Sequence, residues 1–249
     1  MAEQITYHPN GKVQESCTLA DGQLEGEAIT YDEAGNVVRK ANFKAGKLDG
    51  ETLSYDAAGR VMQKATFRDG QLNGETSIFG PDAWIAQKLN YKDGKIHGDV
   101  LSYRNDWIET RSTYFAGSLE GDVITYNETG QVIARAAYSR GKLSGESSWF
   151  DKEGRLLKTV QYFDGKLNGD VIEYYESGAL REKAPYKDDK LEGEFVRYFE
   201  TGIIQERTFF KAGVPYGDKM EFDEAGNLKE AGMKSPTGLR GLLAKITGQ

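Results

Sequence analysis

The sequence predicts an all-β protein: an elongated single-layer antiparallel β-meander built from about ten 24-residue hairpin repeats, with a short C-terminal amphipathic helix. The first observation behind it is that the stretch at residues 46–59, G-K-L-D-G-E-T-L-S-Y-D-A-A-G, recurs along the chain. The second is that successive copies begin 24 residues apart, or 23 residues apart once. The third is that apolar residues alternate within each copy with the period of a strand, and no helix-length segment intervenes.

Each copy opens with a strand that ends in an aromatic residue. In residues 51–55, Leu53 and Tyr55 are two positions apart and therefore lie on one face of a strand. Because residues at one repeat position become neighbours across strands, we interpret the aromatic row as structural. Its members are Tyr7, Tyr31, Tyr55, Phe79, Tyr103, Tyr126, Phe150, Tyr174, Tyr198 and Phe222.

A turn such as D-A-A-G follows, in which Asp opens the turn and Gly takes a left-handed conformation, as in a type I turn with a bulge. The second strand then alternates, with Val61, Ala65 and Phe67 on one face. A second turn, commonly D-G or A-G, leads into the next copy. The lone cysteine, Cys17, belongs to the small-residue row of Ala65, so we expect a packed thiol, and one cysteine excludes an intrachain disulfide.

Two charged rows run through the repeats. The acidic row directly follows the second Gly of each motif, which favours a structural role at the turn. The basic row lies mid-strand and is interpreted either as a solvated face that prevents aggregation or as a ligand-facing stripe. The acidic row is Glu27, Glu51, Glu75, Asp99, Asp122, Glu146, Asp170, Glu194 and Asp218, and the basic row is Lys40, Lys64, Lys88, Arg111, Arg135, Lys183 and Arg207.

The pattern fails once, in the middle of the chain. One copy reads F-G-P-D-A-W and the next reads Y-R-N-D-W, with one residue deleted in the turn. The deletion places Trp84 and Trp107 at the same repeat position of consecutive hairpins, where other copies carry polar residues such as Lys12 or Arg60. Local packing against the shortened turn is one interpretation. The other is a partner-binding site formed by Trp84, Trp107, Lys88 and Arg111.

The regular pattern ends near residue 230, so we divide the chain into a repeat body, 1–230, and a tail, 231–249. In the tail, Leu239, Leu242, Leu243 and Ile246 have the spacing of an amphipathic helix. An end cap for the last hairpin is one role for it, and a membrane or partner contact is the other. The tail holds three basic residues and no acid, so a net charge of −7 for the chain leaves −10 on the body.

No pattern of catalytic or ligand-binding chemistry stands out. The two histidines, His8 and His97, have no cysteine or second histidine at metal-ligand spacing, and no phosphate-binding glycine motif opens a helix. We therefore expect no enzyme, no cofactor and no metal. The acidic charge argues against a nucleic-acid partner. The first residues lack the pattern of a secretory signal and no long apolar run occurs, so we expect a cytoplasmic protein.

The pattern G-K-L-D-G-E-x-x-x-Y-D-x-x-G resembles the MORN-type repeats of bacterial proteins, in the variant found in the YwqK-like antitoxin family. The resemblance covers roughly residues 5–230. It implies a single-layer β-sheet that serves as a binding scaffold, and the antitoxin family implies neutralisation of a toxin by direct binding.

We therefore hypothesise a scaffold that binds a partner protein, most concretely an immunity protein or antitoxin holding a toxic effector inactive. A basic partner such as a nuclease would suit the acidic body. Two alternatives remain open: a membrane-associated scaffold that uses the basic row and the C-terminal helix, and a structural protein that assembles through its sheet ends. Membrane contact is possible but is not favoured.

Stacking of 24-residue units predicts an extended particle, because each unit contacts only its neighbours. Small-angle scattering should give a radius of gyration well above the ~18 Å expected for a compact domain of this length. A value near that figure would contradict the open-sheet prediction.

Overall fold

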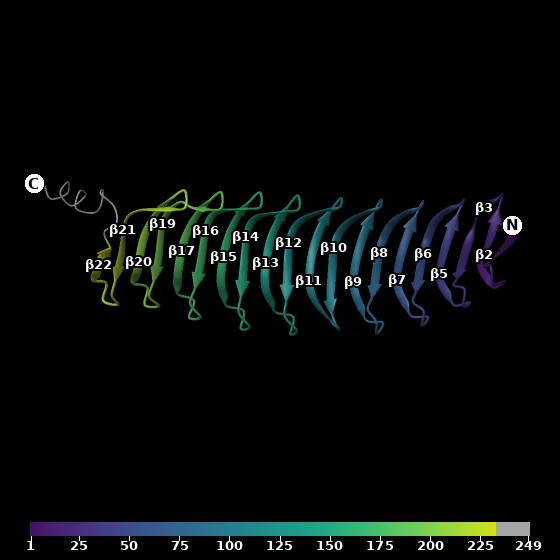
Figure 1. The fold of residues 1–249 in the computed structure, drawn as a ribbon, viewed down its shortest axis with the longest axis horizontal. Coiled ribbons are helices and arrows are strands. Elements are labelled where there is room, and N and C mark those ends of the chain that lie inside the picture. Colours follow the sequence, from purple (N-terminus) through teal and green to yellow (C-terminus); the bar gives the residue numbers. More distant parts are fainter. Residues whose placement is uncertain (233–249) are drawn as a thin grey trace, which may run out of the picture. The chain divides into compact units, whose positions relative to one another are not determined.

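The structure, a computed structural model, describes residues 1–232 and contains strands and turns but no helix in that range. The strands form a 22-stranded antiparallel sheet in which successive strands are neighbours (Figure 1). This confirms the prediction of an all-β antiparallel meander. The last strand, β22, runs over Leu228–Gly232, two residues past the expected end of the repeat body. The proposed C-terminal helix lies outside the described residues.

The chain divides into two compact units. Unit 1 comprises Met1–Gly121 and Glu128–Gly130, and unit 2 comprises Asp122–Asn127 and the chain from Gln131 onward. Strand β12 (Ser118–Tyr126) contributes residues to both units. The other strands of unit 1 are β1 (Ala2–Tyr7), β2 (Val13–Ala20), β3 (Gln23–Leu24), β4 (Gly26–Tyr31), β5 (Val37–Lys44), β6 (Lys47–Tyr55), β7 (Val61–Arg68), β8 (Gln71–Phe79), β9 (Ile85–Lys92), β10 (Lys95–Arg104) and β11 (Trp107–Phe115).

Unit 2 continues the same hairpin pattern. The first strand of a repeat is divided in two places. Glu25 separates β3 from β4 in unit 1, and Glu192 separates β18 from β19 in unit 2, whereas this strand is continuous in the other repeats. The strands of unit 2 are β13 (Val132–Ser139), β14 (Lys142–Phe150), β15 (Leu156–Phe163), β16 (Lys166–Tyr174), β17 (Leu180–Lys187), β18 (Lys190–Leu191), β19 (Gly193–Tyr198), β20 (Ile204–Lys211), β21 (Val214–Phe222) and β22.

The two kinds of turn follow from the sequence as predicted. In the turn after β6, the N–H of Gly59 donates to the carbonyl of Asp56 at 2.9 Å, and the N–H of Asp56 donates to the carbonyl of Arg60 at 2.9 Å. The Asp56 carboxylate also accepts from the N–H of Arg60. At the opposite end of the hairpins, Asp69 and Gly70 both have positive φ, 50° and 82°, which is the two-residue turn that matches strand twist.

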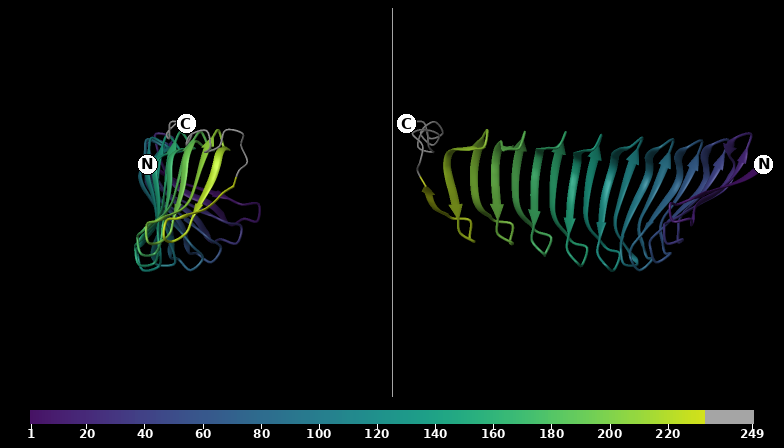
Figure 2. Two further views of the ribbon diagram at one scale, coloured as in Figure 1. Left: turned by 90° about the vertical axis from the view of Figure 1, so that its left-hand side faces the viewer. Right: turned by 45° about the vertical axis from the view of Figure 1, so that its right-hand side comes forward.

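The second glycine of each motif marks a break in the regular pairing of its strand. Strand β6 pairs Leu48 with Phe43 and Thr52 with Ala41, so three residues of β6 face one residue of β5. Gly50, at the middle of this bulge, has φ +106°, a conformation that a residue with a Cβ adopts only with strain. The strands are curved along their length (Figure 2), and we attribute part of this curvature to the bulge.

One face of the sheet in each unit holds the most buried residues, and we call it the core face. In unit 1 a row of small side chains crosses the strands, because Ala41 pairs with Thr52, Thr52 with Ala65, and Ala65 with Thr76. Ala65 is 3% exposed and Thr76 is 1% exposed. Within residues 1–232 no second layer covers this row, so we infer that the larger side chains beside it, such as Phe67 and Leu72, shield it from water.

Cys17 lies in this row and is buried, as predicted. Burial, together with the negative charge of Glu15, raises the pKa of its thiol above the ordinary value. A buried thiol with a raised pKa is a poor nucleophile, so Cys17 is a packing residue.

Backbone hydrogen bonds link the turns of neighbouring repeats. The N–H of Gly46 donates to the carbonyl of Leu24 at 2.9 Å, and Gly70 repeats this contact with Leu48 at 2.8 Å. Each repeat therefore provides a partner for the backbone of the next, which explains why the first motif Gly and the Leu recur together.

The second motif glycines provide a test of backbone strain in unit 2. Gly169 has φ +123°, and a Cβ there would lie 2.7 Å from the Cβ of Gln161. The turn glycine Gly178 serves as the comparison. It has φ +86°, and a Cβ added to it would have no other atom within 4 Å. We expect Gly178→Ala to cost about 1 kcal/mol and Gly169→Ala ~2–3 kcal/mol, because only the second adds a steric clash to the backbone strain. Urea unfolding of both variants measures this, and equal losses would contradict it.

The turn aspartates predict an acid-sensitive contribution to stability. The N–H of Arg60 donates to the Asp56 carboxylate and lowers its pKa below the ordinary value. A lowered folded-state pKa stabilises the fold above about pH 4, and this stabilisation is lost as the pH falls through the folded pKa. The urea midpoint of Asp56→Asn should therefore fall less than that of the parent between about pH 5 and about pH 3.

Asp82→Asn is the control for this experiment, because Asp82 is exposed and makes no hydrogen bond with the described residues. It should keep the parent's pH dependence. An identical pH dependence in all three proteins would show that the Asp56 contacts contribute nothing measurable.

Candidate functional site

The face opposite the core face carries both charged rows, and we call it the ion-pair face. Glu51 and Lys64 lie on adjacent strands in diagonal register, and their side chains are 2.5 Å apart. The same contact recurs in six repeats, so the basic row is not a stripe of unpaired cations. The pairs are Lys64–Glu51, Lys88–Glu75, Arg111–Asp99, Arg135–Asp122, Lys183–Asp170 and Arg207–Glu194.

These pairs change the titration of their members. Hydrogen bonding to Asp122 raises the pKa of Arg135, and hydrogen bonding to Asp170 raises the pKa of Lys183. Each pair is substantially exposed, so its contribution to stability is small. Where Thr159 interrupts the basic row, Glu146 accepts instead from Nε2 of Gln161 at 2.9 Å.

The structure brings Lys88 and Arg111 onto one face. Lys88 of β9 and Arg111 of β11 both pair with Leu101 of β10, so they flank one residue from opposite sides. Lys88 lies 3.7 Å from Glu75, and Arg111 lies 2.7 Å from Asp99. Both cations are therefore partly neutralised by their own repeat.

Trp84 and Trp107 occupy equivalent turn positions, as the sequence predicted. The carbonyl of Trp84 accepts from the N–H of Gly80 at 2.8 Å, which is the contact that Arg60 makes in the preceding hairpin. Trp107 begins β11 and pairs with Arg104 across a two-residue turn, where Asn105 has φ +58°. The one-residue deletion therefore lies in this turn.

The two tryptophans are half-buried. The indole of Trp84 packs over Gly80, because a Cβ at residue 80 would lie 2.5 Å from its Cε2 atom. Trp84 is therefore committed in part to its own turn, and the residue is also partly exposed to solvent. The contact with Gly80 agrees with the local-packing interpretation, and the partial exposure of Trp84 agrees with the partner-contact interpretation.

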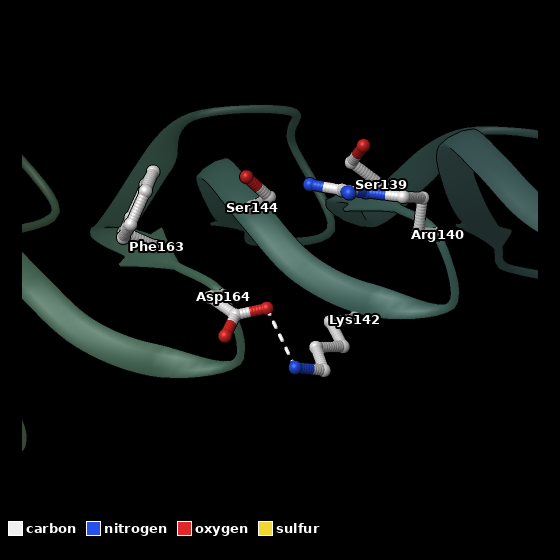
Figure 3. Close-up of a pocket in the computed structure, with 6 residues that line it drawn as sticks. All are labelled: Ser139, Arg140, Lys142, Ser144, Phe163 and Asp164. Carbon is white, nitrogen blue, oxygen red and sulfur yellow. Dashed lines mark hydrogen bonds and ion pairs between the residues drawn. The ribbon is translucent and has the colours of Figure 1, made fainter.

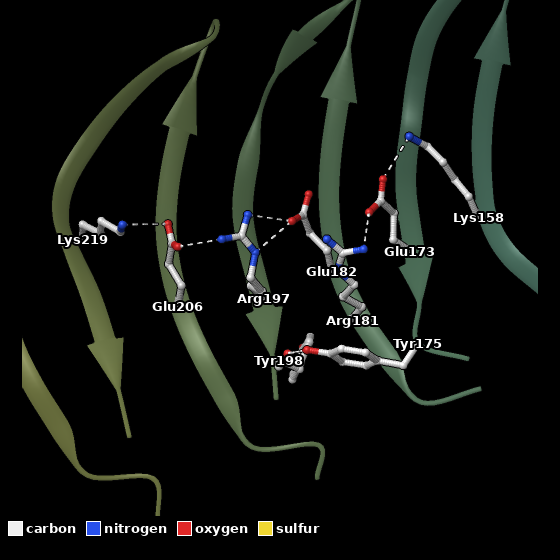
Figure 4. Close-up of polar contacts among 9 residues, drawn as sticks. All are labelled: Lys158, Glu173, Tyr175, Arg181, Glu182, Arg197, Tyr198, Glu206 and Lys219. Atoms are coloured by element: carbon white, nitrogen blue, oxygen red, sulfur yellow. Dashed lines mark hydrogen bonds and ion pairs between the residues drawn. The ribbon is translucent and has the colours of Figure 1, made fainter. Parts of the chain in front are cut away.

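A second charged array lies on the core face of unit 2 and was not predicted from the sequence. Arg197 lies 2.9 Å from Glu182 and 3.4 Å from Glu206, and Lys219 lies 3.4 Å from Glu206 (Figure 4). Lys158 lies 3.1 Å from Glu173 in the same array. Hydrogen bonding to Glu182 raises the pKa of Arg197.

The array compensates for like charges that the register places opposite one another. Glu173 pairs with Glu182, and Glu206 pairs with Glu221. Like charges in such positions repel each other, so the neighbouring cations are needed to hold them together. In unit 1 the same row carries two charged residues, Glu15 and Arg39, and its other members, such as Ser54 and Gln63, are uncharged. The sequence signal that could have revealed the array was the greater frequency of charged residues in this row in unit 2.

The third tryptophan, Trp149, also escaped prediction. It is 37% exposed on β14 and occupies a row position where most other repeats carry polar residues such as Ser54 or Glu173. It borders a core-face recess of 450 Å³ in unit 2. The recess is lined by Trp149, Lys158, Val160, Tyr162, Leu167, Val171 and Tyr186.

Residues 1–232 contain no group of three side chains arranged to hold a metal ion. In the same range the structure has no helix of the length and apolar character needed to cross a membrane. His97 caps a turn, with its Nδ1 atom 3.5 Å from the N–H of Ala116 and its ring 5.0 Å from that of Phe115. This contact gives His97 a structural role.

Comparison with protein families identifies MORN repeat variant segments at residues 2–21, 24–45, 167–188 and 191–212. No curated protein matches the chain. Among solved structures, TcdB2-TccC3 is 13% identical, with a TM-score of 0.21, over 91% of this chain and 17% of that one. TcdB2-TccC3-Cdc42 is 12% identical, with a TM-score of 0.17, over 87% of this chain and 16% of that one. The chain thus spans about a sixth of the length of these structures, which carry no argument about its function.

Proposed function

The chain is a MORN repeat variant protein, and on that premise we propose that it is a non-enzymatic scaffold that binds a partner protein. The most specific form of the proposal is an immunity protein or antitoxin of the YwqK-like kind, which neutralises a toxic effector by direct binding in the cytoplasm. The partner contacts the hairpins of unit 1 that carry Trp84 and Trp107, with Lys88 and Arg111 nearby.

The observation that carries the proposal is the contrast between the repeated and the non-repeated side chains. The charged groups of the ion-pair face recur in nearly every hairpin and are paired within it, for example Lys64 with Glu51. A catalytic constellation would be singular. Large aromatics, Trp84, Trp107 and Trp149, are among the side chains that depart from the repeat, and tryptophan is enriched among the residues that dominate protein-binding energy.

The charge of the chain supports a protein partner over the other candidates. Residues 1–230 carry −10, since the remaining 19 residues hold three basic residues and no acid. This field repels nucleic acid and favours a basic protein surface. The pairing of the basic row also reduces its attraction for anionic lipids, so we favour protein binding over membrane association.

The first test asks whether a toxin is present. Products of the adjacent genes are expressed in a host cell with and without this chain, and growth is measured. We expect one of them to arrest growth and this chain to restore it. If no neighbouring product arrests growth, or if the chain restores growth with none of them, the antitoxin form of the proposal loses its support.

The second test examines the site. We expect the Trp84→Ala/Trp107→Ala double variant to lose ~2 kcal/mol or more of affinity for the purified partner, because truncation of an aromatic anchor removes a large contact area. Isothermal titration calorimetry and thermal melting are measured together. Trp149→Ala in unit 2 is the matched control and should bind normally. A double variant that melts many degrees lower but binds normally when folded would assign both tryptophans to the fold alone.

A further inference from the structure

Trp149 is the one aromatic residue at its repeat position. On the core face of unit 2 it lies directly opposite Ala134 of β13 on one side and Lys158 of β15 on the other. Ala134 is too small to cover the indole, and Trp149 is 37% exposed. A large aromatic surface is therefore open to solvent at a position where the other repeats lack one. The equivalent residues are Thr30, Ser54, Ile78, Ser102, Thr125, Glu173, Arg197 and Glu221.

Two tyrosines join Trp149 in forming an aromatic recess on this face. Tyr162 of β15 and Tyr186 of β17 occupy the same repeat position and line the recess of 450 Å³ together with Trp149. Strand β16 lies between β15 and β17 and contributes Leu167 to the lining. Val160 also lines the recess and is only 3% exposed. The recess therefore combines three aromatic rings with an apolar floor.

The same three rings carry hydrogen-bond donors. The indole N–H of Trp149 and the hydroxyls of Tyr162 and Tyr186 make no hydrogen bond with any other group of residues 1–232. The charged residue of the lining, Lys158, lies 3.1 Å from Glu173, which neutralises it. A matching ligand therefore presents apolar surface to the rings and hydrogen-bond acceptors to the three donors.

The spacing of the two tyrosines matches the period of a polyproline II helix. One strand separates β15 from β17, so residues at equivalent positions are ~9.5 Å apart, two strand spacings. A polyproline II helix completes one turn in three residues, or ~9.3 Å. A segment that crosses the strands would therefore place prolines three positions apart against Tyr162 and Tyr186. Its backbone forms no internal hydrogen bonds, so its carbonyl groups are free to accept from the three donors.

We propose that this recess binds a proline-rich segment of a partner protein in the polyproline II conformation. Aromatic-lined grooves suit such segments because the ligand is ordered before it binds and loses little entropy. The charge of −10 on residues 1–230 complements a segment that carries arginine or lysine beside its prolines. The recess is separate from Trp84 and Trp107, so either proposal can fail without the other.

A second recess of unit 2 supplies the matched control. It has a volume of 530 Å³, lies at the two-residue turns and has a single aromatic ring, that of Phe163, in its lining. Figure 3 shows this ring apart from the ion pair of Lys142 with Asp164. Phe163 is 67% exposed, more than Trp149. If exposure alone governed binding, Phe163 would be the better docking residue, whereas a groove for polyproline II needs several rings.

The test uses the full chain and the acetylated, amidated peptide Arg-Pro-Pro-Leu-Pro-Pro-Leu-Pro. Calorimetry should detect saturable binding, and the indole N–H resonance of Trp149 should shift in nuclear magnetic resonance spectra. The same peptide with alanine at each proline should not bind measurably, because alanine does not preset the polyproline II conformation. Glutamate in place of the arginine should weaken binding at low salt. Cellohexaose, which also stacks on aromatic rings, should not bind, and its binding in place of the peptide would assign the recess to a glycan and overturn the proposal.

Three variants make the test specific, and thermal melting checks that each is folded. Trp149→Ala should weaken peptide binding at least tenfold, because it removes the aromatic anchor. The Tyr162→Phe/Tyr186→Phe double variant keeps both rings and removes both hydroxyls, so it should weaken binding roughly fivefold. Phe163→Ala should bind normally. Equal binding of the proline and alanine peptides, unchanged binding by Trp149→Ala or by the double variant, or an equal loss in Phe163→Ala would overturn the proposal.

Discussion

The architecture depends on the positive-φ glycine that interrupts the first strand of each repeat. At Gly50 the strand places three residues opposite one, and its φ of +106° suits glycine better than any other residue. The bulge sets the register in which Thr52 meets Ala41 and Ala65, which is the buried row of the core face. It also places Glu51 diagonal to Lys64 on the opposite face. Burial and charge pairing therefore follow from one backbone conformation.

Much of this fold could be predicted from the sequence because its determinants are local. The turn type follows from residues such as Asp56 and Gly59, and the burial of Cys17 follows from its row. The deletion before Trp107 was placed in the correct turn because the strands on both sides keep their pattern. In each case the decisive residues lie within one repeat.

The polar contacts were harder to predict because each of them links residues from two different repeat positions on neighbouring strands. The acidic and basic rows were each visible, but the diagonal contact of Glu51 with Lys64 requires the register, which the bulge shifts. The array around Arg197 requires the register of three strands. The orientation of Trp84 over Gly80 depends on an irregular turn, for which no other repeat serves as a guide. The candidate site was therefore located by its position in the repeat, and its side-chain geometry could not be predicted.

The turn-to-turn contacts have a consequence for the evolution of such chains. Every bond between turns, such as Gly70 to Leu48 or Ala45 to Glu25, reaches only to the adjacent copy. A duplication of one 24-residue segment would therefore insert a copy with all its partners already in place. Its mutations could then accumulate independently of the other copies, and the different residues Glu25, His97 and Ser144 at one repeat position illustrate this. Gene duplication can thus supply new surface without the need to redesign what lies on either side.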